Sequence, residues 1–285
     1  MKIAGVQMDV KIGEAARNVA RMQDALREAA KQHGASLAIF PECAVSGYCF
    51  GDIAEARANA EPLTGPSVTA LAKTCRELGV YAIVGMLERD GERIFNAAVL
   101  IGPEGVAGNY RKIHLPYLGV DMLTTHGDQP LAVHAAGDLR VGMNICYDAA
   151  FPEATRVMAI LGADLIALPT NWPPGAEATA RHAIPTRALE NDVYFAAVNR
   201  VGEERGFRFI GMSSICGPNG EILAASAGAD EEILYAEIDP ARARRKRIVR
   251  VPGKHEIDRL ADRRPEFYAA LTAPHSLTMP RDLPR

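Results

Sequence analysis

The sequence lacks the features that mark secreted, zinc-binding or membrane-spanning proteins. Its five cysteines are odd in number and include no C-x-x-C pair, so we expect neither a disulfide scaffold nor a zinc site. No apolar run approaches the roughly 20 residues that a membrane-spanning helix needs. The opening residues Met1–Val6 do not have the shape of a signal peptide. We therefore expect a soluble, cytoplasmic protein with reduced thiols and no membrane partner.

An excess of charge of one sign is also missing. The chain has 32 basic and 35 acidic residues, which gives a formal net charge of −3. This balance gives no reason to expect nucleic acid as a partner. The composition, with 48% hydrophobic and 24% charged residues over 285 positions, is typical of a globular protein that can bury a large core in one domain.

Short β-branched runs alternate with longer alanine-rich segments of helical pattern, and this alternation favours a layered α/β fold. Gly34 and Gly79 stand where two of the helices would end in a left-handed cap. The expected helices are 14–32, 67–78, 152–161 and 178–191, and the expected strands are 2–7, 37–40, 80–86, 96–101, 141–145, 165–168 and 194–199.

Three short segments of the first half recur in the second half in the same order. The pairs are 34–41 with 162–169, 80–84 with 193–198, and 102–105 with 217–220. Such a repeat indicates two similar halves, each a sheet with helices on one face. Stacked through their bare faces, the two sheets would form a four-layer α-β-β-α sandwich.

The last 45 residues differ from the rest. Residues 241–250 carry six basic side chains, and prolines recur at positions 252, 265, 274, 280 and 284. A basic run is usually a solvated face. We interpret 241–285 as a C-terminal arm that packs on the same domain or on a neighbouring subunit.

Three residues capable of acyl-transfer chemistry follow apolar segments. Glu42 comes directly after the strand expected at 37–40, Cys146 follows 141–145, and Lys112 lies in the segment 110–116. Loops at strand ends hold reactive groups on a rigid scaffold. Alone, each has a plain structural explanation: a buried thiol, a solvated glutamate or a surface lysine. Together they supply a nucleophile, a proton acceptor and a cation for developing negative charge.

The strand–cysteine–helix arrangement around Cys146 resembles a nucleophile elbow, in which a sharp turn presents the thiol and free backbone N–H groups face an oxyanion. A helix N-terminus nearby would also favour the thiolate. The other four cysteines, at positions 43, 49, 75 and 216, are interpreted as structural.

The segments that contain these residues resemble the three motifs of the nitrilase-like carbon–nitrogen hydrolase family. The motifs are Phe40-Pro41-Glu42, Tyr110-Arg111-Lys112-Ile113-His114-Leu115 and Asn144-Ile145-Cys146-Tyr147-Asp148, with further likenesses at 151–153, 163–172 and 187–191. The resemblance implies a carbon–nitrogen hydrolase domain over residues 1–240 with the four-layer sandwich. It also implies Cys146 as nucleophile, Glu42 as proton shuttle and Lys112 as oxyanion clamp, with neither metal nor organic cofactor.

The activity implied is hydrolysis of a small linear amide to a carboxylic acid and ammonia through a thioester. The backbone N–H of Tyr147 would assist Lys112, and Asn171 and Trp172 are further candidates for contacts with the substrate or the oxyanion. Many family members carry a second glutamate between the lysine and cysteine motifs. Here Asp121 is the acidic residue nearest to that place, one methylene shorter.

Other functions remain open at this point. Within the family they are N-carbamoyl amidohydrolase and nitrilase. Relatives that cleave N-carbamoyl-D-amino acids carry paired arginines after the nucleophile, whereas Ala149 and Ala150 stand here, and true nitrilases usually have Trp-Glu rather than Tyr147-Asp148. Outside it are a papain-like enzyme with a histidine base (His114, His126 or His182) and a binding protein without activity. The resemblance further implies a homodimer or higher homo-oligomer.

Overall fold

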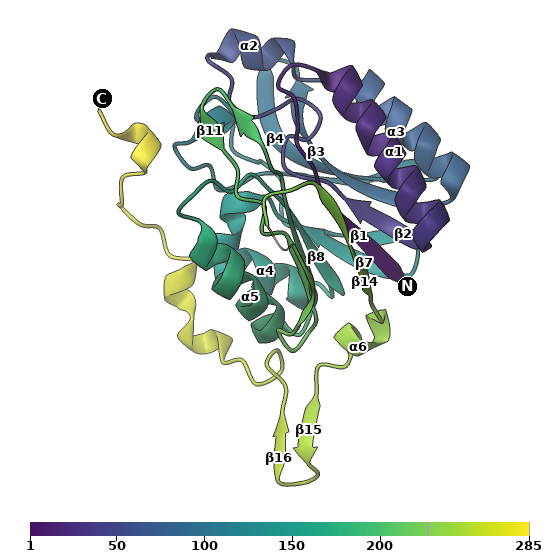
Figure 1. Cartoon of the computed structure of the whole chain (residues 1–285). Helices are drawn as coiled ribbons and strands as arrows, with labels where there is room; N and C mark the ends of the chain where they lie inside the picture. Colours follow the sequence, from purple (N-terminus) through teal and green to yellow (C-terminus); the bar gives the residue numbers. More distant parts are fainter. Residues whose placement is uncertain (227, 285) are drawn as a thin grey trace.

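Two six-stranded sheets pack face to face and carry helices on their outer faces (Figure 1). The computed structural model describes residues 1–226 and 228–284. The first sheet has the order β14 (Glu232–Glu237), β1 (Lys2–Gln7), β2 (Ala35–Ile39), β3 (Tyr81–Asp90), β4 (Arg93–Gly102) and β5 (Gly105–Arg111). The second has the order β13 (Ile222–Ala225), β12 (Ser214–Cys216), β9 (Tyr194–Asn199), β8 (Leu165–Thr170), β7 (Leu139–Met143) and β6 (Val133–Ala136).

The two sheets have the same internal plan. Strands β1, β2 and β3 are parallel and are followed by antiparallel β4 and β5, just as parallel β7, β8 and β9 are followed by antiparallel β12 and β13. The repeated segments of the sequence lie at equivalent places, on β2 and β8, on β3 and β9, and at the β4–β5 and β12–β13 turns. The predicted four-layer sandwich of two similar halves is confirmed.

Apolar side chains of both sheets meet in one buried cluster between them, which includes Ile3, Ile39 and Ile83 from the first sheet and Leu165 and Phe195 from the second. Because these strands are covered on both faces, they are apolar almost throughout instead of alternating. This core fixes the loops at the strand ends, where the candidate residues lie.

Helices α1 (Ala15–His33) and α3 (Pro66–Leu78) cover the first sheet, where Val19, Met22 and Leu26 of α1 join a second apolar cluster. Both helices end at a glycine with φ of 68°, Gly34 and Gly79, as predicted. The short α2 (Ile53–Ala58) lies above them in Figure 1, and α4 (Pro152–Ile160) and α5 (Ile184–Asn191) cover the second sheet.

Several predicted bounds differ from the structure: β3 and β4 are longer than the strands expected at 80–86 and 96–101, and two further elements end differently. The helix expected at 178–191 is a π-helical turn, η3 (Thr179–Ala183), followed by α5. Pro185 explains the change, since it has no N–H to donate to the preceding turn. The strand expected at 141–145 ends at Met143, so Asn144 and Ile145 already belong to the turn that leads to Cys146.

The predicted arm, 241–285, starts inside the short helix α6 (Pro240–Arg244) and continues as a hairpin of β15 (Ile248–Val251) and β16 (His255–Ile257) that projects from the sandwich (Figure 1). Three 3-10 turns follow, η4 (Pro265–Phe267), η5 (Ala269–Leu271) and η6 (Pro280–Asp282). The arm contacts its own chain: Arg259 pairs with Asp192 at 2.7 Å, and the Lys246 ammonium donates to the Asp192 carbonyl at 2.6 Å.

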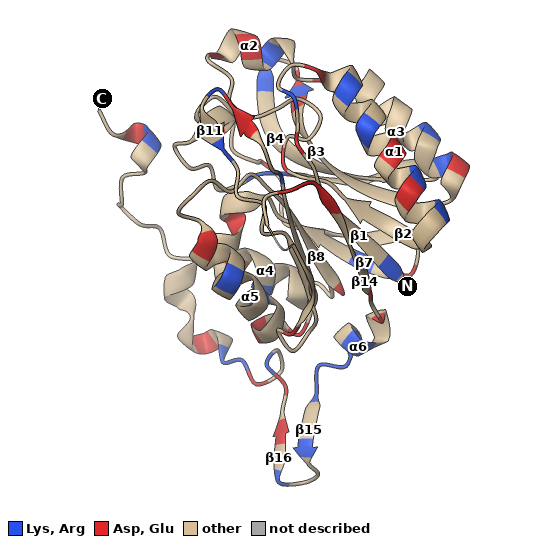
Figure 2. Cartoon of the chain, in the orientation of Figure 1, with Lys and Arg blue, Asp and Glu red and all other residues tan. Residues whose placement is uncertain are grey.

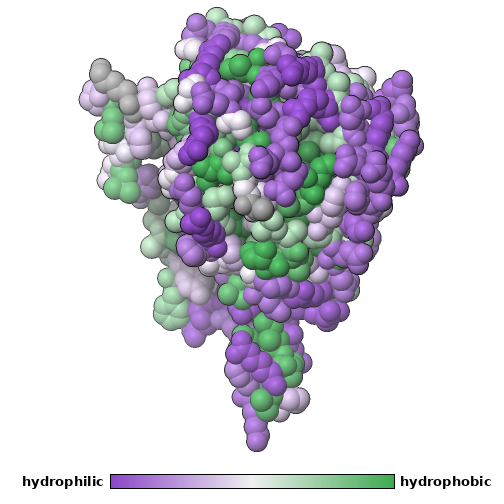
Figure 3. Space-filling model, in the orientation of Figure 1, coloured by the Kyte–Doolittle hydropathy of each residue, from purple (hydrophilic) through white to green (hydrophobic). Residues whose placement is uncertain are grey.

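Charged residues lie mainly on the outer helices and along the arm, whose first part is basic (Figure 2). Apolar residues also reach the surface of the projecting hairpin, as Figure 3 shows, among them Val249 and Val251. Across residues 1–226 and 228–284, no helix combines the length and the apolar character needed to cross a membrane.

Candidate active site

The loops that follow β2, β5 and β7 carry the three predicted reactive residues. Glu42 comes three residues after the end of β2, Lys112 directly follows β5, and Cys146 begins the 3-10 helix η2 (Cys146–Ala150) after β7. Asp121 lies on another 3-10 turn, η1 (Gly119–Met122). The side chains of Glu42, Lys112 and Asp121 are completely buried, and Cys146 is 7% exposed.

The Lys112 ammonium lies between two carboxylates. Its Nζ is 2.8 Å from Oε1 of Glu42 and 2.6 Å from Oδ2 of Asp121. The side-chain amide of Asn96, on β4, donates to the same two groups, at 2.7 Å to Oε1 of Glu42 and 2.9 Å to Oδ1 of Asp121. Oε2 of Glu42 has no hydrogen-bond partner within the described part of the chain. One oxygen of Glu42 is therefore held by Lys112 and Asn96, and the other is a free acceptor.

Burial raises the pKa of the Glu42 carboxyl above its usual range, although Lys112 acts in the opposite direction, and the nearby Asp121 charge raises it further. For Lys112, burial by itself would lower the pKa, but the Asp121 and Glu42 charges outweigh it and raise the pKa well above its usual value. The ammonium therefore stays charged, and the Glu42 carboxylate takes up a proton more readily than an exposed glutamate does.

Cys146 has a positive φ of 45°, which a side-chain-bearing residue seldom adopts, and this agrees with the sharp turn predicted at the elbow. Burial raises the pKa of its thiol to about 12, and the Glu42 charge adds to the rise, while Lys112, the Thr170 hydroxyl and the Asn171 backbone lower it. Burial therefore favours the neutral thiol over the thiolate, and the contribution of a helix N-terminus stays a prediction.

The remaining candidates lie around Cys146. Tyr147 is the second residue of η2, and N–H groups in the first turn of a helix have no partner inside it. Its ring is exposed and packs edge-on against Phe151. Asn171 directly follows β8 and is buried, and within residues 1–226 and 228–284 neither polar atom of its side chain has a hydrogen-bond partner. Trp172 is buried, with its backbone N–H donating to Asn199.

Sequence reasoning missed Asn96 and Tyr48. The Tyr48 hydroxyl donates to Oδ2 of Asp121 at 2.9 Å, and its backbone N–H donates to the Glu204 carboxylate. Glu204 in turn forms an ion pair with the fully buried Arg200. Asn96 could have been singled out from sequence, because it is a polar residue inside the apolar run of β4. Nothing in the local sequence marks Tyr48, because its contact with Asp121 depends on how two distant loops fold.

The histidines make other contacts. Nδ1 of His114 is 2.7 Å from the Asp148 carboxylate, Nδ1 of His126 is 2.9 Å from the Ile113 carbonyl, and His182 is exposed. Among the residues that the structure describes, no hydrogen bond joins a histidine to Cys146, as a papain-like pairing would require. The same residues contain no cluster of three or more His, Cys, Asp or Glu side chains that could hold a metal ion.

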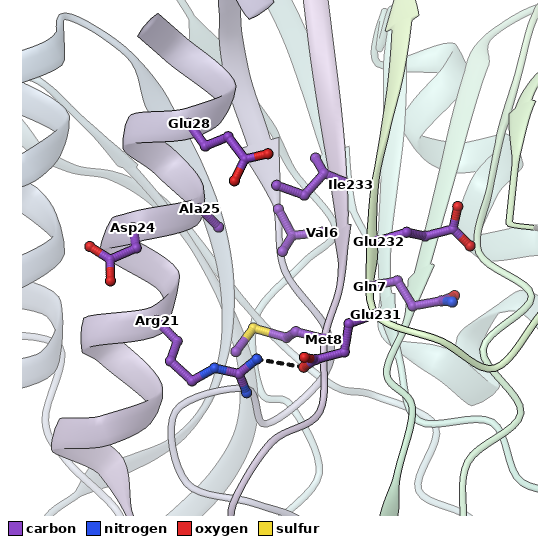
Figure 4. Close-up of a pocket in the computed structure, with 10 residues that line it drawn as sticks. All are labelled: Val6, Gln7, Met8, Arg21, Asp24, Ala25, Glu28, Glu231, Glu232 and Ile233. Carbon is purple, nitrogen blue, oxygen red and sulfur yellow. Dashed lines mark hydrogen bonds and ion pairs between the residues drawn. The ribbon is translucent and has the colours of Figure 1, made fainter. Parts of the chain in front are cut away.

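A separate hollow of about 390 Å³ opens between α1 and the β1–β14 pair (Figure 4). Arg21 and Glu231 form an ion pair at 2.5 Å in it, and Asp24, Glu28 and Glu232 make its wall acidic. None of the predicted site residues lines it. It is therefore a feature of the outer surface, apart from the buried Glu42–Lys112–Asp121 group.

Known proteins share this architecture. A family profile described as "Carbon-nitrogen hydrolase" matches residues 2–248. A nitrilase of Pyrococcus abyssi is 40% identical over 94% of this chain and 99% of its own length. An (R)-stereoselective amidase of a Pseudomonas species is 35% identical over 93% of this chain and 92% of its own length.

Similar solved structures are also amidases. An amidase from Nesterenkonia sp. AN1, a double mutant in complex with acrylamide, superposes with a TM-score of 0.79 at 25% identity, over 95% of this chain and 97% of that one. A further mutant of that amidase, with the same TM-score and identity, has the acetamide moiety of fluoroacetamide added covalently at its active-site cysteine.

Proposed function

The chain belongs to the carbon–nitrogen hydrolase family, and on that premise we propose that it hydrolyses a small linear amide to a carboxylic acid and ammonia through a thioester on Cys146. The observation that carries the proposal is the buried Glu42 carboxylate with one oxygen held by Lys112 and Asn96 and the other without a partner in the described residues. Such a carboxylate is poised to take a proton and give it back.

The first half of the proposed reaction forms the thioester. Glu42 takes the proton of the Cys146 thiol, and the sulfur attacks the amide carbonyl carbon. The Lys112 ammonium and the backbone N–H of Tyr147 stabilise the negative charge that develops on the carbonyl oxygen. Glu42 then returns the proton to the amide nitrogen, the C–N bond breaks, and ammonia leaves.

The second half releases the product. Glu42 takes a proton from a water molecule, and the oxygen of that water attacks the thioester carbon. The C–S bond breaks, the carboxylic acid leaves, and the proton on Glu42 returns to the Cys146 sulfur. The raised pKa of Glu42 suits both proton transfers, because a general base works best when its pKa lies near the working pH.

The substrate class proposed is an amide with neutral or cationic side groups. Ala149 and Ala150 follow Asp148, so these positions offer no cation to a substrate carboxylate, and burying an unpaired carboxylate costs several kcal/mol. Arg181 and Arg187 lie after Asn171 and could supply such a cation, but Arg181 is exposed and Arg187 donates to the Ala149 carbonyl and to Glu190. Asp121 is bonded to Lys112, Asn96 and Tyr48, so we assign it to holding Lys112 and not to attracting amines.

The test is a side-by-side measurement of kcat/KM for a short aliphatic amide, its amino-substituted analogue, an N-carbamoyl amino acid and the matching nitrile. Ammonia release reports turnover, and the Cys146→Ala variant is the control for background. We expect the two amides to be cleaved best. A preference for the N-carbamoyl compound or the nitrile would contradict the amide assignment and favour one of the two alternatives in the family.

A further inference from the structure

Asp148, two residues after Cys146, is a completely buried carboxylate with no lysine or arginine partner among the described residues. Four donors surround it instead. Its Oδ2 accepts from the Ile145 backbone N–H at 2.8 Å and from the Tyr110 hydroxyl at 2.7 Å. Its Oδ1 lies 3.2 Å from the His114 backbone nitrogen and 2.7 Å from Nδ1 of the same residue. All four donors belong to residues that lie within two positions of Cys146 or Lys112 in the sequence.

The donors come from two segments that lie far apart in the sequence. Ile145 directly precedes Cys146, whereas Tyr110 and His114 stand two residues before and two residues after Lys112. One carboxylate therefore ties the turn that carries the thiol to the segment that carries the ammonium. The His114 ring also stacks on Phe151, the residue after η2, with centroids 3.7 Å apart. This contact holds the C-terminal end of η2 against the segment that carries Lys112.

The turn needs such a restraint. Cys146 has a φ of 45°, and a residue with a side chain keeps this conformation only where its surroundings fix it. The hydrogen bond from the Ile145 N–H to Asp148 spans Cys146 and holds its turn. The hydrogen bonds from Tyr110 and His114 hold the Asp148 carboxylate in place.

We infer that Asp148 is a positioning residue that fixes the Cys146 thiol relative to Lys112. The inference rests on the proposed roles of Cys146 and Lys112. Reacting groups displaced by about 1 Å can lose on the order of 10²-fold in rate. The contribution of Asp148 is therefore expected in the chemical step and not in the affinity for the substrate.

The test is the Asp148→Asn variant. The amide has one acceptor oxygen and one NH2 donor, so two of the four donors would face another donor. We expect kcat for the amide found in the substrate screen to fall about 10²-fold with KM unchanged. Alkylation of Cys146 by iodoacetamide, followed by peptide mass, should slow in parallel, because the thiol moves away from Glu42 and Lys112.

The matched control is Asp164→Asn. Asp164 is equally buried, but Arg140 and Arg244 hold it next to the first residue of β8, at the opposite end of the strands from Cys146. This variant should lose thermal stability while the alkylation rate of Cys146 stays at the wild-type value. The alkylation readout needs no substrate, so it separates this inference from the proposed function, whose failure would appear as absent turnover in the wild type.

If Asp148→Asn does not fold, two smaller changes make the same test. Tyr110→Phe removes one donor, and His114→Phe removes another while it keeps a ring to stack on Phe151. Each should lower kcat and the alkylation rate with KM unchanged. Wild-type kcat and wild-type alkylation in Asp148→Asn, or in the Tyr110→Phe/His114→Phe double variant, would overturn the inference. A loss confined to KM would overturn it as well.

Discussion

At the scale of single residues, the central feature is a buried group of two carboxylates and one ammonium. Asp121 and Glu42 both contact Lys112, but only Asp121 has both oxygens bonded within the described residues, to Lys112, Asn96 and Tyr48. We therefore propose different roles for them: Asp121 keeps Lys112 charged and in place, while Glu42 keeps an oxygen available for protons.

Replacing Glu42 or Lys112 with alanine should lower kcat by about 10²–10⁴-fold, since each acts in the chemical step through proton transfer or charge stabilisation. Steady-state kinetics on the preferred amide measures the effect. The exposed pair Lys73 and Glu77, 3.9 Å apart on α3, offers matched alanine controls that should leave kcat unchanged. A loss limited to KM in Glu42→Ala or Lys112→Ala would indicate a binding role instead.

The Asp121→Asn variant should change the pH dependence. The negative charge of Asp121 raises the pKa of Glu42, so its removal lowers that pKa. Glu42 must be ionised to act as base, and activity is therefore lost as the pH falls through its pKa. The acidic limb of the kcat/KM profile should move to lower pH in the variant. A limb that stays in place or moves to higher pH would show that Asp121 does not influence the base.

At the scale of elements, β3 determines where Glu42 can lie. The loop after β2 crosses Gly85 so closely that a Cβ there would be 2.3 Å from the Pro41 carbonyl oxygen and 2.7 Å from Cα of Glu42. A side chain on this strand residue would thus push the loop that carries the proposed base. The glycine is needed for close approach of two backbones and not for an unusual φ.

Gly85→Ala is accordingly expected to lower both stability and kcat. Overpacking of this kind typically costs about 1–3 kcal/mol, and a shift of Glu42 by part of an ångström slows proton transfer. Chemical denaturation and steady-state kinetics measure the two effects. Gly228→Ala is the matched control, because a Cβ at Gly228 meets open space. Wild-type kcat in a folded Gly85→Ala protein would contradict the proposed importance of the Glu42 loop.

The elements that sequence patterns predicted best are the buried parallel strands. The strands expected at 2–7 and 194–199 have the bounds of β1 and β9, because their apolar runs end at clear polar or turn residues. The edge strands β5, β6, β13 and β14 were not predicted, since they are partly exposed and have no continuous apolar pattern. Glu42, Lys112 and Cys146 could be proposed from sequence because each follows an apolar strand. The contacts of Tyr48 and Glu204 depend on tertiary packing, which local patterns do not contain.

At the scale of the whole molecule, the two halves contribute unequally to the site. Glu42, Lys112 and Asp121 come from the first half and Cys146 from the second, so the site exists only when the two sheets are stacked. The Arg200–Glu204 pair links the halves nearby: Arg200 donates to the Val10 carbonyl and Glu204 accepts from the backbone N–H of Tyr48.

Apolar residues also remain exposed on the outer face of the second half. Ile160 and Leu161 at the end of α4 are about half exposed, and Phe267 and Leu271 on the arm are exposed still more. Together with the family resemblance, this supports the prediction that the protein associates as a dimer or a higher homo-oligomer. Light scattering at micromolar concentration should give at least twice the chain mass of 30.7 kDa. A mass of one chain would contradict it.

Acid quenching during turnover of a short amide, followed by mass measurement of the protein, detects the proposed thioester itself. We expect an acyl group on the peptide that contains Cys146, and on no other cysteine peptide. Cys146→Ala should show neither the adduct nor ammonia release, whereas Cys43→Ala, Cys49→Ala and Cys216→Ala should keep most activity. A folded Cys146→Ala protein that releases ammonia at the wild-type rate would contradict the account.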